Sequence, residues 1–440
     1  MRKFAIVCAL PLGAAAVSAC GGDDVTLYPS DAASARHEAS TADVTVLPDS
    51  DGGPDTSAPP ADASPDATPP PPARLLLSIN NTATSELVAL NVGSKKVDGR
   101  FVYPGFIGTT FTGGDAPWLL EQANDLVVRL DRQEPWRPLS SWNVALTDKK
   151  DGGDAYSDPY AVVVGAGPKG YVLRFTRNIL AVLDTSKLVD AGAPQSTIDL
   201  ASLVQPNDGD GLVDMTTGFF VPSRHLVYVV LGNYDKNLFG ASGLACSKTV
   251  ATVTAIDTMT DQIVSLGGNG PGGSIQLLGF SPANAVYDAA GDRILVVHDG
   301  CTATSDGGTA VVRSGVEEVS LASKTTKMLL DANALGFPGA FAYVDPTHAV
   351  IGFGFGQEVH AWDPTKTTVG APIPNAPDAN SFVADGLGNI LGVRTTPIDG
   401  GKTLDIVSVR IENGQSTTLA KNPFTDNTGF IGGVQLWPHP

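Results

Sequence analysis

From residue 74 onward, apolar and polar positions alternate in short runs that are separated by Gly, Pro, Asp and Asn. One example is HLVYVVLGN (225–233), followed by VATVTAIDTMTDQIVSL (250–266); another is DRILVVHD (292–299), followed by GVEEVSLASKTTKMLLD (315–331). Period-two alternation rich in β-branched residues, with such boundaries, predicts strands joined by turns. We therefore expect an all-β chain built from antiparallel hairpins.

The same phrase of apolar run, turn, apolar run and polar-ended strand recurs seven times over residues 74–440, at about 52 residues per unit. This period is typical of four-stranded propeller blades. Later units begin with an extra leading strand, such as NAVYDA (284–289) or GAFAYVD (339–345), but the first unit has none. The last strand, GGVQLWP (432–438), is therefore predicted to pair as the innermost strand of blade one and to close a seven-bladed ring.

Three segments carry a more specific pattern: YVLRFTRNILAVLDTSK (171–187), YVVLGN (228–233) and HAWDPTK (360–366). They resemble the YVTN-type β-propeller repeat, and the resemblance covers most of residues 74–440 as a repeated architecture. Four of the seven units keep only the strand pattern. An aspartate ends the third strand in three units, and its spacing before Thr suits a side chain that caps the following turn. These aspartates are Asp184, Asp257 and Asp363.

The first 19 residues predict an export signal, with Arg2 and Lys3 before an apolar stretch of about 14 residues, too short for a permanent membrane helix. VSAC (17–20) resembles the lipobox of bacterial lipoproteins, in which the cysteine carries lipid. The resemblance implies that Cys20 is lipidated and anchors the protein in the cell envelope. Gly21 follows the cysteine, which implies the outer membrane. The same three residues before the cysteine also suit an ordinary signal peptidase, which would leave a secreted protein.

Residues 20–73 have a different composition, rich in Pro, Asp and Ala, with ten acidic residues against the single basic residue Arg36. Such a segment buries too little apolar surface to offset the entropy of ordering, so it predicts a disordered tether. The whole chain has a formal net charge of −18. This acidity argues against nucleic acid or an anionic lipid surface as the main partner.

In a four-stranded blade, the connections between strands two and three and from blade to blade lie on one face. The long insertions fall almost entirely in these connections: 147–158, 203–214, 233–249, 267–281, 299–314 and 397–403. Long loops on one face of a rigid scaffold are the usual place for binding. Cys246 and Cys301 lie in such loops of the neighbouring blades four and five. In an exported chain they are predicted to form a disulfide that staples these loops.

The sequence contains no Gly-x-Ser-x-Gly elbow, His-Glu-x-x-His motif or phosphate-binding loop, so it predicts no catalytic residue, no metal and no cofactor. Two acidic clusters (Asp148, Asp151 and Asp154; Asp208, Asp210 and Asp214) lack the ligand offsets of an EF-hand, and solvated loops explain them better than calcium sites. Polar residues at the loop end of second strands are the candidate ligand contacts. They are Glu121, Arg174, Asn233, His298 and Arg394.

We therefore expect a lipid-anchored envelope propeller that binds a protein, a glycan or a small molecule through its long-loop face. YVTN-like and related propellers include lactone-opening and lyase enzymes, so the resemblance leaves an envelope enzyme with a site in the central channel as the alternative. A passive scaffold within an envelope complex is a third hypothesis. Fold alone does not decide among these functions.

Overall fold

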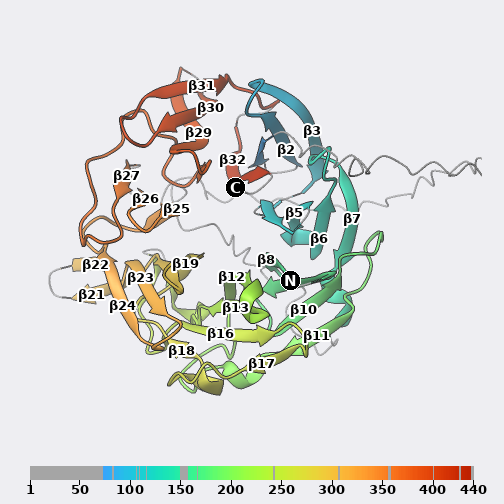
Figure 1. Ribbon diagram of the computed structural model, residues 1–440, viewed down its shortest axis with the longest axis vertical. Helices are drawn as coiled ribbons and strands as arrows, with labels where there is room; N and C mark the ends of the chain where they lie inside the picture. Colours follow the sequence, from blue (N-terminus) through green and yellow to red (C-terminus); the bar gives the residue numbers. More distant parts are fainter. Residues whose placement is uncertain are drawn as a thin grey trace, which may run out of the picture. The chain divides into compact units, whose positions relative to one another are not determined.

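The computed structural model describes residues 73–437, apart from 82–83, 106, 109, 115, 149–156, 166, 241–242, 306–307, 355–357, 400 and 426–427. The predicted signal peptide, Cys20 and the predicted tether up to residue 72 lie outside the described residues. The described residues form seven small antiparallel blade sheets in a ring, together with two short hairpin sheets (Figure 1). The predicted all-β, seven-bladed propeller is confirmed.

Blades one to three have four strands each. From the innermost to the outermost, they are β32 (Phe430–Trp437), β1 (Arg74–Asn80), β2 (Thr84–Asn91) and β3 (Lys96–Pro104) in blade one; β4 (Thr110–Gly113), β5 (Ala116–Glu121), β6 (Leu126–Leu130) and β7 (Pro138–Asn143) in blade two; and β8 (Pro159–Val164), β9 (Lys169–Arg174), β10 (Ile179–Asp184) and β11 (Ser196–Asp199) in blade three.

Blades four to seven continue the same order. Their strands are β12 (Met215–Val221), β13 (Leu226–Leu231), β16 (Thr252–Asp257) and β17 (Gln262–Val264), with β18 (Ile275–Gln276) also on β16, in blade four; β19 (Pro282–Asp288), β20 (Arg293–His298), β23 (Gly315–Ser320) and β24 (Thr326–Asp331) in blade five; β25 (Pro338–Asp345), β26 (His348–Phe353) and β27 (Glu358–Trp362) in blade six; and β28 (Phe382–Ala384), β29 (Asn389–Ile398), β30 (Gly401–Arg410) and β31 (Ser416–Ala420) in blade seven.

Helical structure among the described residues is limited to short 3-10 turns. These are η1 (Gln122–Asn124), η2 (Val144–Thr147), η3 (Ala201–Leu203), η4 (Pro222–Arg224), η5 (Lys236–Leu238) and η6 (Pro271–Gly273). None of these turns is long and apolar enough to cross a membrane.

The C-terminal strand β32 closes the ring by pairing with β1, antiparallel and on its inner side (Figure 1). Leu75 faces Leu436 and Leu77 faces Val434 in this register. Leu75, Leu77 and Leu436 belong to one apolar cluster between blades one and seven. The predicted closing strand is confirmed.

Each blade is buried on both faces, because an apolar cluster fills every interface between neighbouring blades. Strand β13 shows how the alternation achieves this. Val227 and Val229 pack toward blade three, whereas Tyr228 and Val230 pack toward blade five. Alternate side chains of a strand point to opposite faces, so one strand supplies two cores.

Blade six has a reduced outer edge. Its sheet has three regular strands, and a single bridge between His360 and Pro372 takes the place of the fourth. Gly370 and Ile373 still donate backbone hydrogen bonds to Ala361 and Val359 (N–O 2.9 and 2.7 Å). Proline lacks the N–H that a regular strand donates, so a Pro-containing segment is confined to the sheet edge.

Candidate functional site at the loop face

The two faces of the ring differ because every blade has the same strand order. We call the side with the connections between strands one and two and between strands three and four the turn face, and the opposite side the loop face. On the turn face, Asp184, Asp257 and Asp363 accept hydrogen bonds from the backbone N–H of Ser186, Met259 and Thr365 (N–Oδ1 3.1, 2.8 and 2.9 Å). Their predicted capping role is confirmed.

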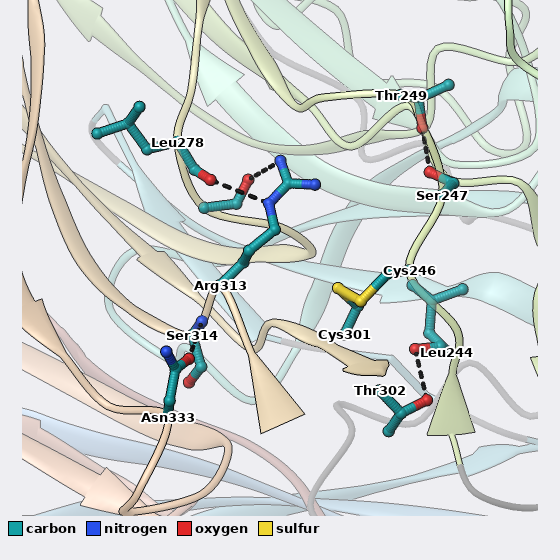
Figure 2. Close-up of a disulfide and its surroundings, with 11 residues drawn as sticks. Leu244, Cys246, Ser247, Thr249, Leu278, Cys301, Thr302, Arg313, Ser314 and Asn333 are labelled. Carbon is teal, nitrogen blue, oxygen red and sulfur yellow. Dashed lines mark hydrogen bonds between the residues drawn. A yellow bond between two sulfur atoms is a disulfide. The ribbon is translucent and has the colours of Figure 1, made fainter. Parts of the chain in front are cut away.

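On the loop face, a disulfide joins Cys246 of blade four to Cys301 of blade five (Figure 2), with the two Cα atoms 5.0 Å apart. The predicted staple is confirmed. It connects two small hairpins, β14–β15 (Phe239–Gly240 and Gly243–Leu244) and β21–β22 (Cys301–Ser305 and Gly308–Val312). The backbone N–H of Cys246 and the hydroxyl of Thr302 add hydrogen bonds across the junction, to Thr302 O and Leu244 O (3.2 and 3.1 Å).

Arg174, a predicted ligand contact, is fully buried at the end of β9. Its guanidinium donates to the carbonyl oxygen of Val144 (3.0 Å), to Ser157 Oγ (2.8 Å) and to Asp148. These contacts fasten the connection between blades two and three to the propeller body. Its Nε and Nη1 donors serve the scaffold, whereas the buried Nη2 has no hydrogen-bond partner among the described residues, and contact with a ligand stays a prediction for this residue.

His298, at the end of β20, is also fully buried, and its Nε2 lies 3.0 Å from Oε2 of the buried Glu317. The Glu317 carboxylate accepts the backbone N–H groups of Leu278 and Gly279 (2.8 and 3.0 Å). A Cβ added at Gly279 would lie 2.2 Å from the His298 ring, so this close approach requires glycine. The pair therefore anchors the linker into blade five.

Asn233 and Glu121 also engage protein groups. Asn233 Nδ2 donates to Val250 O (3.1 Å) and Thr252 Oγ1 (3.3 Å). The Glu121 carboxylate accepts from Asn124 Nδ2 (3.2 Å), and burial raises the pKa of Glu121. Their contact with a ligand also stays a prediction.

Arg394 differs from the other four predicted residues because it does not lie at a strand end. The β29–β30 hairpin continues until Ile398 pairs with Gly401, so Arg394 lies within β29, where it is partly exposed. The sequence predicts a long loop over 397–403, but the described residues of this segment continue the hairpin. Thr and Ile favour extended structure, which explains the extra pairing.

A cluster that sequence reasoning missed lies on the loop face between blades three and five. Its aromatic rings form a chain, with centroid distances of 5.5 Å for Tyr160–Phe175, 5.5 Å for Phe175–Tyr234 and 6.2 Å for Tyr234–Phe280. Tyr234, from blade four, reaches blade five and donates its hydroxyl to the carbonyl oxygen of Pro282 (3.3 Å). The chain therefore connects three blades.

Two carboxylates, Asp158 and Asp299, accompany this aromatic chain. Asp299 is only 7% exposed and Asp158 is partly buried, and neither carboxylate accepts a hydrogen bond from any residue that the structure describes. Burial raises the pKa of Asp299 to about 8. Burial, and then the charge of Asp125, raise the pKa of Asp158 to about 6. Burial raises the pKa of Tyr160, and the charges of Asp299 and Asp158 raise it further, so both carboxylates act on the same phenol.

The matching position in blade four shows the usual role of such an aspartate. Asp214 precedes the inner strand β12 as Asp158 precedes β8, and both have a positive φ (49° and 48°). The Asp214 carboxylate accepts the backbone N–H of Tyr234 (2.7 Å), whereas the Asp158 carboxylate has no such partner among the described residues. Asp158 is therefore not needed as a cap.

The structure describes the two aspartate clusters noted in the sequence to different extents. Asp151 and Asp154 lie outside the described residues. Ligand atoms of Asp208, Asp210 and Asp214 lie within 4.8 Å of one another, and burial raises the pKa of Asp208 to about 6. Among the described residues, this cluster of three carboxylates is the one with enough ligand atoms close together to hold a metal ion.

No protein-family model matches this chain, and no curated protein is significantly similar to it in sequence. Similar solved structures are propellers of diverse function. A putative 6-phosphogluconolactonase from Bacteroides fragilis is 10% identical, covering 85% of this chain and 99% of that chain with a TM-score of 0.49. Apo AztD from Citrobacter koseri is 10% identical, covering 83% and 98%, with a TM-score of 0.45.

A third similar structure is the dihydro-heme d1 dehydrogenase NirN in complex with DHE. It is 12% identical and covers 80% of this chain and 73% of that chain, with a TM-score of 0.45. At such low identity the likeness is one of fold, and a propeller hosts many unrelated functions. The function must therefore be argued from the loop face itself.

Proposed function

We propose that this protein is a lipid-anchored binding module of the bacterial cell envelope, with its ligand site on the loop face of the propeller. The export signal and the lipobox-like VSAC support the anchor at Cys20, and the acidic, Pro-rich segment after it supports a spacer. Labelling cells with radioactive palmitate tests the anchor. Wild-type protein is expected to incorporate label, and Cys20→Ala is expected to incorporate none.

One observation carries the proposed site. Asp158 and Asp299 are carboxylates without a hydrogen-bond donor among the described residues, although Asp299 is more than nine-tenths buried. Buried polar groups in proteins are nearly always paired, so a largely buried carboxylate that no protein group satisfies is available to accept a hydrogen bond from water or from a ligand. The proposed site uses this free acceptor capacity.

Thermal-shift measurements on the full-length protein in detergent test this function. The ligand panel contains divalent metals, sugars, cell-wall fragments and small charged compounds. A ligand that binds only the native state stabilises it by about 2.7 kcal/mol at a hundredfold excess over its dissociation constant. We expect a saturable shift that is lost in Asp158→Asn/Asp299→Asn and kept in Asp345→Asn, a control on the turn face. A shift that the double variant keeps, or no shift with any compound, would contradict the proposal.

A second candidate function is an envelope enzyme, and the same carboxylates favour it. The carboxyl groups of Asp299, with a pKa of about 8, and Asp158, with a pKa of about 6, both act on the Tyr160 phenol, and carboxyl groups with separated pKa values suit general acid–base catalysis. This hypothesis requires turnover of a bound compound, measured as product formation. Saturable binding without any product would leave the binding module as the function.

A further inference from the structure

A groove of about 550 Å³ lies between blades four and five. Blade four contributes β18 and the linker that follows it, and blade five contributes Arg313 and the turn at Lys324 before β24. Neither carboxylate of the proposed loop-face site lines this groove. Ligand pockets commonly have volumes of about 300–1,000 Å³, so the groove is a second, separate place that is large enough to hold a small molecule.

The charges along this groove differ from those of the whole protein. Among the described residues, two cations and no carboxylate line it, although the chain has 46 acidic residues against 28 basic ones. The Arg313 guanidinium donates to the carbonyl oxygens of Leu278 (3.1 Å) and Gly279 (3.2 Å), as Figure 2 shows for Leu278. The Lys324 ammonium donates to the carbonyl oxygen of Leu321. Neither cation forms an ion pair with a carboxylate that the structure describes.

Glu317 is the acidic residue whose charge acts on Arg313. Burial lowers the pKa of Arg313, and the charge of Glu317 raises it by less, but arginine stays charged at neutral pH. The Glu317 carboxylate is fully buried, lies 3.0 Å from His298 Nε2 and accepts the backbone N–H groups of Leu278 and Gly279. Glu317 therefore offsets part of the charge of Arg313 without lining the groove.

The other side chains of the groove are amides, hydroxyls and apolar groups. The amides of Asn269 and Gln276 and the hydroxyl of Thr326 form no hydrogen bond with a described residue. Amide and hydroxyl groups both donate and accept, so they match the hydroxyl groups of a sugar. Leu277 is buried and Leu278 is 50% exposed, and together they offer apolar surface to the C–H groups of a sugar ring.

We propose that this groove binds an acidic saccharide, whose carboxylate is attracted by Arg313 and Lys324 and whose hydroxyl groups form hydrogen bonds with Asn269 and Gln276. Charge-assisted hydrogen bonds to the two cations select the acid over a neutral sugar. A free acidic sugar and an acidic unit of a polysaccharide share this chemistry, and the experiment distinguishes them. The inference adds a second site to the protein and does not depend on the loop-face site.

Titration calorimetry on the full-length protein in detergent compares galacturonate with galactose, its neutral counterpart, and with acetate, which has the charge without the sugar ring. We expect saturable binding of galacturonate and at least tenfold weaker binding of both other compounds, because each lacks one half of the recognition chemistry. Trigalacturonate separates the two sources of the ligand. Tighter binding than galacturonate identifies a polysaccharide, and equal or weaker binding identifies a free sugar.

Lys324→Gln is expected to weaken galacturonate binding about tenfold, because it removes a charge-assisted hydrogen bond. Gln276→Ala is expected to weaken it several-fold. Lys327→Gln is the matched control, because Lys327 is an exposed lysine of β24 that does not line the groove, and it should bind galacturonate as the wild type does. Arg313 also holds the linker in place, so the test relies on Lys324 and Gln276, and circular dichroism checks that each variant is folded.

Several results would overturn the inference. Galactose binding as tight as that of galacturonate would show that charge is not recognised, and equally tight binding of acetate would show that the sugar is not. An affinity that neither Lys324→Gln nor Gln276→Ala changes would place the ligand elsewhere. Failure of both galacturonate and trigalacturonate to bind would exclude this ligand class.

The test of the loop-face site remains distinct. A thermal shift with galacturonate that Asp158→Asn/Asp299→Asn keeps and Lys324→Gln loses belongs to the groove, and the other compounds of the panel then decide the loop-face proposal. A galacturonate shift that Asp158→Asn/Asp299→Asn loses and Lys324→Gln keeps would assign the acidic sugar to the loop face and contradict the groove.

Discussion

On the turn face, the Asp257 and Asp345 carboxylates accept backbone hydrogen bonds, and on the loop face Asp158 and Asp299 accept none from the described residues. The pKa values follow this difference. Backbone hydrogen bonds from Thr347 hold the pKa of Asp345 at about 2, and those from Thr260 and Met259 lower the pKa of Asp257. Burial raises the pKa of Asp158 to about 6 and that of Asp299 to about 8.

The comparison distinguishes carboxylates that hold a turn of the fold in place from carboxylates that have no such role. A carboxylate that accepts several backbone N–H groups is stabilised in its charged form, and its role is to hold a turn. A buried carboxylate without donors costs stability, and such costs are concentrated at functional sites. The two carboxylates with raised pKa values lie on the loop face, and the disulfide lies on the same face. The predictions below test each part of this contrast.

The largest expected effect comes from the disulfide, which holds the loop face together. Cys246→Ser/Cys301→Ser is expected to lower the free energy of unfolding by about 4 kcal/mol on the chain-entropy estimate, because the two cysteines are 55 residues apart. Urea unfolding of the full-length protein measures the loss. Reduction of the disulfide with dithiothreitol should lower the free energy of unfolding of the wild type by a similar amount and should not change that of the variant. Equal stability of the two proteins would show that the staple does not constrain the chain.

On the turn face, the strongest effect is expected at Asp288, which is 3% exposed and accepts from the backbone of Ala290 and Gly291 (both 3.1 Å) and from Arg293 Nε (2.8 Å). Asp288→Ala is expected to cost about 2 kcal/mol, since it leaves charge-assisted donors unpaired. Burial opposes ionisation, but these hydrogen bonds keep the pKa of Asp288 below its ordinary value.

The contribution of the Asp288 carboxylate is therefore present above the unfolded-state pKa near 4 and is lost as the pH falls through the lower folded-state pKa. Urea unfolding at pH 7 and at pH 2 measures this contribution. The difference in the free energy of unfolding between the wild type and Asp288→Ala should be large at pH 7 and smaller at pH 2. A difference that does not change with pH would assign the loss to packing.

On the loop face, Asp299 should give the opposite pH dependence. Unfolded Asp ionises near pH 3.8, and in the folded protein Asp299 keeps its proton up to about pH 8. Between these values the folded protein binds the additional proton, so wild-type stability falls as the pH rises. Asp299→Asn is expected to flatten this slope between pH 4 and 8, as measured by Tm. Asp345→Asn is the control and should keep the wild-type slope; equal slopes in Asp299→Asn and the wild type would contradict burial of an ionisable group.

The smallest effect is expected at Asp257. Its carboxylate accepts the N–H groups of Met259 and Thr260 (2.8 and 2.9 Å), but both residues are exposed, so water can replace it. Asp257→Ala should lower Tm slightly, and Asp257→Asn, which keeps one acceptor, should lower it less. A loss in Asp257→Ala as large as that of Asp288→Ala would mean that exposure does not decide the strength of these caps.

The architecture was predictable from sequence because it depends on local, repeated rules. Alternation in segments such as 226–231 determines both faces of a strand, and the missing leading strand of the first unit predicts the pairing of β1 with β32. The outer edge of blade six was less predictable. Pro372 and Pro374 remove donors that a regular fourth strand would use, and only the three-dimensional pairing shows which bonds remain.

Three of the missed site residues follow directly after residues that the sequence predicted. Phe175 follows Arg174, Tyr234 follows Asn233 and Asp299 follows His298. Arg174 and His298 are the last residues of β9 and β20, and neighbouring side chains in extended backbone point to opposite sides, so the residue that follows each of them meets different surroundings. A polar residue at a strand end is visible in sequence. Its burial, and the absence of a partner, depend on loops from other blades that sequence does not position.

The pairing of β32 with β1 makes the order of synthesis important. Synthesis produces β1 first and the eight residues of β32 last among the described strands, so the inner edge of blade one stays open until almost the whole chain has been made. A chain shortened by a premature stop before residue 430 leaves that edge unpaired and Leu75 and Leu77 uncovered. Such edges invite aggregation and proteolysis. Only a completed chain can therefore close the ring and reach the stability of the closed propeller.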